Sequence, residues 1–128
     1  EKEVEFCEIT EGFTQMSGIY NSNYKDSLNR IQKKSNSKIN IIKTKSTTFE
    51  KIIPSNRIVD IVSIDIEGNE LEVIKSIDFN KHEIKVILLE NNIPQKLNYI
   101  NFFKTINFSY FDRVGMDEIY YNKKYYNF

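Results

Sequence analysis

Acidic residues at the ends of two apolar runs are the strongest candidates for chemistry in this sequence. Asp65 and Glu67 end a run that begins at Val59, and Glu90 ends a run that begins at Ile84. Both runs are rich in β-branched residues, which is typical of strands covered on both faces. A carboxylate at a strand end can hold a substrate hydroxyl or take up its proton. Asp65, Glu67 and Glu90 are therefore the candidate site residues.

The same acids also have structural interpretations that the residues alone leave open. Asp65 could cap the turn after its strand, and Glu67 and Glu70 could stabilise the next helix through its dipole. Asp65, Glu67 and Glu90 could also bind Mg²⁺ through oxygen atoms. Zinc is not expected, since the chain has one histidine and one cysteine. We predict no metal site.

These acids must be positioned by a strand, a helix and a second strand. We predict the strands at residues 58–66 and 84–90 and the helix at residues 70–77, with Gly68 allowing a tight turn. A crossover of this length is expected to be right-handed. Neighbouring strands lie about 5 Å apart, so the two acidic strand ends would meet at one edge of the sheet, where ligands of open α/β sheets bind.

The other elements are predicted from shorter patterns. Thr47 and Glu50 fit a capping box, Pro54 would end that helix, and Asn107 would end a later one. The predicted segments are a strand at residues 3–9, a loop at 10–24, helices at 25–34 and 47–53, a strand at 39–43, a helix at 95–106, and a hairpin at 108–113 and 118–121. The loop at 10–24 could contain a short extended piece at residues 13–20. The predicted fold class is α/β, with parallel strands followed by an antiparallel hairpin.

Composition restricts the class of protein. The 128 residues suit a single domain, and the formal net charge of zero gives no reason to expect a nucleic-acid or membrane partner. Cys7 has no internal partner, so we expect a reducing, cytoplasmic compartment. The sequence contains no run long enough to span a membrane. The expected partner is a small-molecule or glycan substrate, and a homodimer is compatible with the sequence.

Residues 62–70, which read VSIDIEGNE, resemble the signature of the FkbM family of S-adenosylmethionine-dependent methyltransferases. The family's signature is followed by a helix and a second strand ending in glutamate, here Glu90. Ser63 stands where the family usually has lysine. Residues 45–53 resemble the family's short Thr-x-Leu-Asp segment, and residues 108–121 resemble its closing hairpin, with Asp117 before the last strand.

The resemblance implies a partial Rossmann-like sheet of the class I methyltransferase type and S-adenosylmethionine as cofactor. It implies methyl transfer to an oxygen of a sugar or small metabolite, with Asp65, Glu67 and Glu90 as catalytic residues on the acceptor side. No Gly-x-Gly occurs in the sequence. We therefore expect residues 1–128 to be one FkbM-like methyltransferase domain without the N-terminal cofactor-binding strands, and the cofactor-binding residues stay unknown. The alternative is a non-catalytic α/β interaction module derived from this fold.

Overall fold

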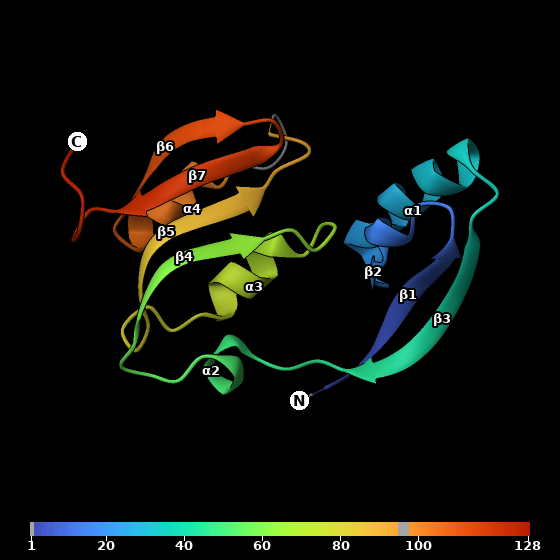
Figure 1. Cartoon of the computed structure of the whole chain (residues 1–128), viewed down its shortest axis with the longest axis horizontal. Coiled ribbons are helices and arrows are strands. Elements are labelled where there is room, and N and C mark those ends of the chain that lie inside the picture. Colours follow the sequence, from blue (N-terminus) through green and yellow to red (C-terminus); the bar gives the residue numbers. More distant parts are fainter. Residues whose placement is uncertain (1, 95–97) are drawn as a thin grey trace.

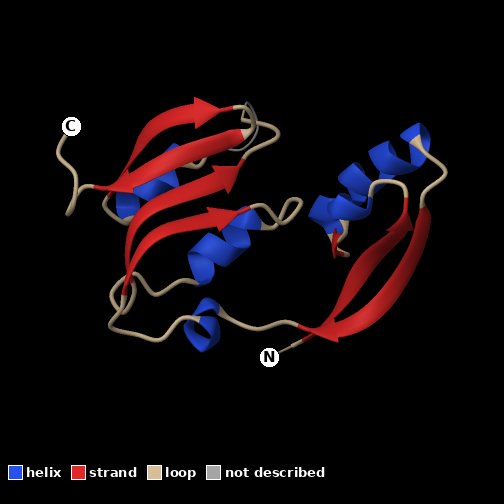
Figure 2. Ribbon diagram, viewed as in Figure 1, coloured by secondary structure: helices blue, strands red, loops and turns tan. Residues whose placement is uncertain are grey.

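A computed structural model of the chain describes residues 2–94 and 98–128. It contains two sheets that lie side by side, each with its own helices (Figures 1 and 2). We call residues 2–46 the N-terminal lobe and residues 49–128 the C-terminal lobe. No helix in the described residues is long and apolar enough to cross a membrane. The candidate acids lie in the C-terminal lobe, on the side that faces the other lobe.

The N-terminal lobe is an antiparallel sheet of order β2-β1-β3 with one long helix. Its elements are β1 (Glu3–Glu11), the 3-10 turn η1 (Thr14–Met16), β2 (Gly18–Ile19), α1 (Ser22–Lys34) and β3 (Lys38–Lys45). Tyr24, Leu28 and Ile31 form an apolar stripe on α1 and pack against Cys7 and Ile9 of β1. This stripe holds α1 on the sheet and leaves its polar face directed outward.

The C-terminal lobe is a mixed sheet of order β4-β5-β7-β6. Its elements are α2 (Phe49–Ile52), β4 (Ile58–Ile64), α3 (Glu70–Ser76), β5 (Glu83–Glu90), α4 (Ile100–Thr105), β6 (Phe108–Val114) and β7 (Asp117–Asn122). Strands β4 and β5 are parallel, whereas β7 is antiparallel to both β5 and β6. The predicted mixed α/β organisation, including the C-terminal hairpin, is confirmed.

The main core joins one face of this sheet to the helices. Ile87 and Leu89 of β5 are fully buried, and Ile74 of α3 belongs to the same cluster. The ring of Phe103 on α4 stacks on that of Tyr120 on β7, with centroids 3.7 Å apart. Because α3 and α4 are fixed on the sheet in this way, the loops at the carboxyl ends of β4 and β5 start from rigid elements.

Several local predictions differ from the structure. The short extended piece expected at residues 13–20 is observed as β2, but the loop predicted at residues 10–24 also contains η1. Helix α1 begins at Ser22 and not at residue 25, because the Asn21 side chain accepts a hydrogen bond from the Tyr24 amide at 3.0 Å. The Thr47 capping box is wrong, since Thr48 is the N-cap of α2 and its side chain makes no capping bond. Glu50 instead accepts from the Asp78 amide at 3.3 Å.

The remaining elements agree with their predictions except at their ends. Strand β4 ends at Ile64, so Asp65 and Ile66 belong to the following turn. Asn107 has the predicted left-handed conformation, with φ of 64°. The helix predicted at residues 95–106 is observed as α4 from Ile100, and residues 95–97 lie outside the described residues.

Candidate functional site

The turn between β4 and α3 is held by a buried carboxylate. Glu67 and Gly68 both have left-handed backbone angles, with φ of 59° and 102°. Glu70 is 3% exposed, and its Oε1 accepts hydrogen bonds from the amides of Ile66 at 3.2 Å and Gly68 at 2.8 Å. These bonds satisfy backbone donors that the tight turn would otherwise leave unpaired. Glu70 therefore has the structural role that the sequence left open.

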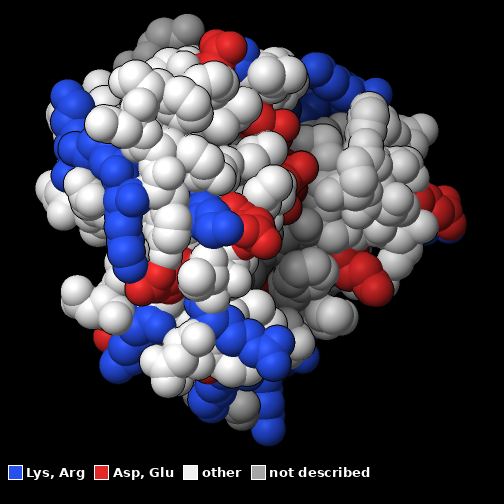
Figure 3. All heavy atoms as spheres, turned by 60° about the vertical axis from the view of Figure 1, so that its left-hand side comes forward, with Lys and Arg blue, Asp and Glu red and all other residues white. Residues whose placement is uncertain are grey.

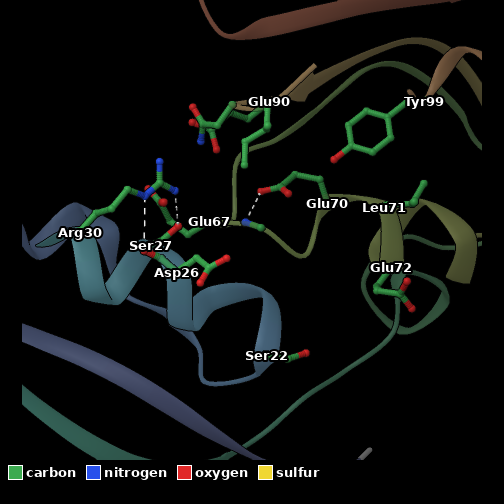
Figure 4. A pocket seen from close by; sticks show the side chains of 13 residues that line it. Ser22, Asp26, Ser27, Arg30, Glu67, Glu70, Leu71, Glu72, Glu90 and Tyr99 are labelled. Carbon is green, nitrogen blue, oxygen red and sulfur yellow. Dashed lines mark hydrogen bonds between the residues drawn. The ribbon is translucent and has the colours of Figure 1, made fainter. Parts of the chain in front are cut away.

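A cavity of about 300 Å³ lies between this turn and helix α1 of the other lobe. Figure 4 shows side chains entering it from α1, from the turn and from the end of β5. The lining residues are Ser22, Asp26, Ser27, Arg30, Glu67, Gly68, Glu70, Leu71, Glu72, Glu90, Asn92, Ile93 and Tyr99. Residues of both lobes line the cavity, so it forms only where the two lobes pack together.

Two contacts place the N-terminal lobe against the acidic turn. The Asn21 side-chain amide donates to Oδ1 of Asn69 at 2.5 Å. Gly18 is buried, and a Cβ atom built on it would lie 3.5 Å from Cβ of Glu67 and 2.9 Å from the ring of Tyr24. A side chain at residue 18 would therefore collide with the Tyr24 ring of its own lobe, whereas its distance to Glu67 is an ordinary contact between the lobes. Figure 3 shows acidic side chains along the boundary between the lobes.

The three predicted site residues fall into two groups. Glu67 and Glu90 line the cavity, whereas Asp65 is exposed and is not among the lining residues. The negative charge of Asp65 nevertheless raises the pKa of both Glu67 and Glu90, so its carboxylate lies within electrostatic reach of them. The expectation that acids from the ends of β4 and β5 lie close together agrees with this geometry.

Glu90 is the most strongly perturbed of these acids. Burial, followed by the charge of Asp65, raises its pKa to about 7, and a hydrogen bond from Asn92 only partly opposes this rise. Burial likewise raises the pKa of Glu67, with further contributions from Asp65 and Glu70 and an opposing one from Arg30. A carboxyl group with a pKa near neutrality exchanges protons readily at physiological pH, which suits a general base.

The sequence did not identify the part of the cavity that α1 and Tyr99 supply. Ser22, Asp26 and Arg30 follow one another at i, i+4 spacing on the polar face of α1, a pattern that ordinary exposed helices share. Arg30 donates to Oγ of Ser27 at 3.2 Å and lies beside Glu67 in Figure 4. Only the packing of the two lobes reveals that this face is directed into a site.

A satisfied polar network supports the same end of β5. Glu118 of β7 accepts hydrogen bonds from the Asn91 side chain at 2.9 Å and from the Tyr120 hydroxyl at 2.5 Å. Its Oε1 also lies 3.3 Å from the guanidinium of Arg113, which donates to the Asn91 carbonyl at 2.8 Å. The network therefore joins the residue after Glu90 to the closing hairpin.

The structure also bears on a possible metal site and on the place of His82. No cluster of three or more His, Cys, Asp or Glu side chains suited to a metal ion occurs among residues 2–94 and 98–128. His82 is 1% exposed and packs edge-on against Phe49, with ring centroids 5.1 Å apart. It directly precedes β5, whereas Glu90 ends that strand, so His82 belongs to the opposite edge of the sheet, as predicted.

Comparison with known proteins gives one match. The family model described as the methyltransferase FkbM domain matches residues 3–116, which extend from β1 to the end of β6 and include every described residue that lines the cavity. Searches of curated proteins and of solved structures gave no significant match.

Proposed function

This chain belongs to the FkbM methyltransferase domain family, and we propose that it serves in S-adenosylmethionine-dependent methyl transfer to a hydroxyl group of a sugar or other small metabolite. In this proposal the cavity between α1 and the acidic turn is the acceptor side of the site. The C-terminal lobe would be the closing part of a Rossmann-like class I methyltransferase sheet, which its strand order β4-β5-β7-β6 and parallel β4–β5 pair support.

The observation that carries the proposal is the environment of Glu90. This half-buried carboxyl group lines the cavity, and burial with the charge of Asp65 raises its pKa to about 7. A hydroxyl oxygen that is methylated must lose its proton, and a base with a pKa near the working pH is well matched to accept it. Glu90 would take that proton, while Asp65 and Glu67 keep its affinity for protons high.

The remaining catalytic effect would come from positioning. Methyl transfer requires the nucleophilic oxygen to be held close to the methyl group and in line with the bond that breaks. Glu67 would orient the acceptor from the turn, and Glu70 would act indirectly by holding the amides of Ile66 and Gly68. Asp65 would act on Glu90 through its charge.

The cofactor fits this chain only in part. S-adenosylmethionine would supply the methyl group, but the tight glycine-rich turn that receives nucleotide cofactors in doubly wound sheets has no counterpart here. Gly68 has φ of 102° in the turn after β4, yet Glu67 and Asn69 beside it are larger residues, and Glu70 already occupies the amides of the turn. We therefore assign no residue of this chain to the cofactor.

The test compares two glutamates at opposite ends of β5. We would measure transfer of a radiolabelled methyl group from S-adenosylmethionine to a panel of sugars and small polyols, using the chain and, in parallel, the chain extended by any coding sequence before Glu1. Glu90→Gln should lower the rate by about 10²–10⁴-fold, whereas Glu83→Gln, at the other end of the strand, should change it little. Absence of cofactor binding and transfer in both forms would refute the proposal.

A non-catalytic interaction module is the alternative that one observation favours. In the described sheet β4 is an edge strand, and Ile58 and Ile61 on it are 56% and 61% exposed. Apolar edge strands of this kind tend to pair with other strands. This alternative predicts a stable dimer or complex without turnover, so any sugar methylation by the 128-residue chain would exclude it.

A further inference from the structure

Tyr99 is a buried residue whose polar group has no assigned partner. Its side chain is 3% exposed and lines the cavity. None of the described residues forms a hydrogen bond with its hydroxyl, and the pKa of this hydroxyl is raised to about 12 by burial and by the charges of Glu70, Glu118 and Glu90. Buried tyrosine hydroxyls usually have a hydrogen-bond partner. The Tyr99 oxygen is not among the fully buried unpartnered atoms of the described residues, so it reaches the open space of the cavity, where a ligand can accept its hydrogen bond.

The direction of the Tyr99 side chain agrees with that role. Figure 4 shows its hydroxyl pointing into the cavity toward Glu70, across from the side chains of α1. The hydroxyl stays protonated at neutral pH, because the surrounding negative charges disfavour the phenolate. It is therefore a hydrogen-bond donor, whereas Glu70 uses Oε1 to accept from two backbone amides.

The charges around the cavity restrict what Tyr99 can bind. Among the described lining residues, Arg30 is the one that carries a basic side chain. The acidic lining residues are Asp26, Glu67, Glu70, Glu72 and Glu90. Even with Glu90 partly protonated, this lining is negative at neutral pH. It would repel a phosphate or carboxylate and attract an ammonium group.

Hydrogen-bonding groups face one another across the cavity. Ser22 and Ser27 of α1 offer hydroxyls, and Arg30 offers guanidinium donors next to Ser27. Opposite them are the carboxyl groups of Glu67 and Glu90 and the hydroxyl of Tyr99. Such alternating donors and acceptors suit a ligand with several hydroxyl groups.

Building on the proposed function, we propose that the Tyr99 hydroxyl donates a hydrogen bond to the methyl acceptor, and that this acceptor is a polyol carrying an amine instead of an acidic group. The amine would lie among the carboxylates of the turn and α1. Tyr99 is then a specificity-determining residue, and the N-terminal lobe takes part in acceptor recognition through α1.

The test uses three sugars that differ in charge. The isotope-labelled 128-residue chain is titrated with glucosamine, glucose and glucose 6-phosphate, and amide chemical shifts are followed by NMR. We expect glucosamine to bind most tightly and glucose 6-phosphate least tightly, with shifts centred on the amides of Ser27, Gly68 and Tyr99. Equal affinity for the phosphate and the amine, shifts elsewhere, or no binding of any of the three would overturn the proposal.

A pair of variants tests the hydroxyl itself. Tyr99→Phe keeps the ring and should weaken glucosamine binding about fivefold, the effect of losing one hydrogen bond. Tyr126→Phe removes a hydroxyl from the C-terminal tail, where the ring stacks on Phe128, and should leave the affinity unchanged. Equal affinities of the two variants would contradict the role of Tyr99.

The binding experiment can be separated from the proposed function, because it needs no cofactor. If glucosamine binds at Tyr99 but neither it nor any other sugar of the panel is methylated, the methyl-transfer proposal fails while the recognition site stands. If other sugars are methylated and glucosamine does not bind, methyl transfer stands and the assignment of an amine-bearing acceptor fails.

Discussion

Glu90 and Glu118 lie on neighbouring strands, and their carboxyl groups differ in surroundings although Glu90 is half-buried and Glu118 is buried. Glu90 pairs with Asp117, and Glu118 pairs with Leu89, so the two glutamates are one register position apart and on opposite faces of the sheet. Glu118 is surrounded by donors from Asn91, Arg113 and Tyr120. Glu90 has Asn92 as a donor, and the charges of Asp65, Glu67 and Glu70 oppose its ionisation.

Burial alone therefore does not prepare a carboxyl group for chemistry. A buried carboxylate that accepts several hydrogen bonds from neighbouring side chains fixes the structure around it. A carboxyl group beside other acids retains its proton to higher pH and can exchange it. The first arrangement holds the hairpin on β5, and the second leaves a reactive group at the end of the same strand.

The largest effect should come from breaking the structural network. Glu118→Ala would leave the Arg113 charge and the Tyr120 hydroxyl without their partner, so we expect a loss of about 3 kcal/mol in the free energy of unfolding. Urea denaturation followed by circular dichroism would measure it. Asp117→Ala, an exposed neighbour on the same strand, is the matched control and should change stability little. Equal losses in both variants would show that the network adds no stability.

A second pair of variants tests the turn that positions Glu67. Glu70→Ala removes the acceptor of the Ile66 and Gly68 amides and should cost about 1–2 kcal/mol of unfolding free energy. Glu72→Ala, on the exposed side of α3, removes only a surface pair with Lys75 and should cost less than about 0.5 kcal/mol. Thermal unfolding of both variants provides the comparison, and a reversed order would remove the structural role of Glu70.

The pH dependence of stability should distinguish Glu90 from its neighbours. Its pKa rises from 4.5 to about 7 on folding, so between these values the folded chain binds more protons than the unfolded chain, and stability falls as pH increases. The full shift corresponds to about 3 kcal/mol, which solvent in the open cavity should reduce to about 1–2 kcal/mol.

Glu90→Gln removes this ionisation. The variant should therefore be more stable than the parent chain at pH 8 and no more stable at pH 4. Glu83→Gln is the control, and its effect on the pH dependence of stability should have the opposite sign. The reason is that Lys124 and Tyr125 hold the pKa of Glu83 below its usual value. Denaturant midpoints measured from pH 4 to pH 8 would show the difference, and parallel curves for parent and Glu90→Gln would contradict the assigned environment.

The smallest expected effect concerns the contact between the lobes. Arg30 lowers the pKa of Glu67 against the opposing effects of burial, Asp65 and Glu70. Arg30→Ala should therefore raise the pKa of Glu67 further, which an NMR titration of its carboxyl carbon would detect. Lys25→Ala, on the same helix beside the Tyr20 ring, should leave it unchanged. A Glu67 titration identical in the parent and Arg30→Ala would indicate that α1 does not face the acidic turn in solution.

The pattern of apolar residues was sufficient to predict the strand–helix–strand unit from β4 to β5. Residues 58–66 and 84–90 carry the strand pattern clearly, and the acids that follow them were expected at one edge. The expected cover of both faces is wrong for β4, because it is an edge strand on which Ile58 and Ile61 are exposed. Gly68 was expected to allow a tight turn and Asn107 to end a helix in the left-handed conformation, and both residues have positive φ.

The parts that were missed depend on contacts between segments distant in sequence. Glu50 has the spacing of a capping residue, but its carboxylate accepts a hydrogen bond from the Asp78 amide, because tertiary packing brings these two groups together. Arg30 occupies an ordinary polar helix face, and Tyr99 lies within the helix predicted at residues 95–106, whose pattern does not indicate that this side chain enters a cavity. Their roles arise from how the lobes and α4 pack around the turn, which no short window of sequence contains.

The central claim is that Glu90 is a proton-accepting carboxyl group at the end of β5. The direct measurement is an NMR titration of its side-chain carboxyl carbon in the 128-residue chain between pH 3 and pH 9, assigned with the Glu90→Gln variant. We predict a midpoint near pH 7, as burial and the charge of Asp65 require. A midpoint near the ordinary value of 4.5 would contradict the claim.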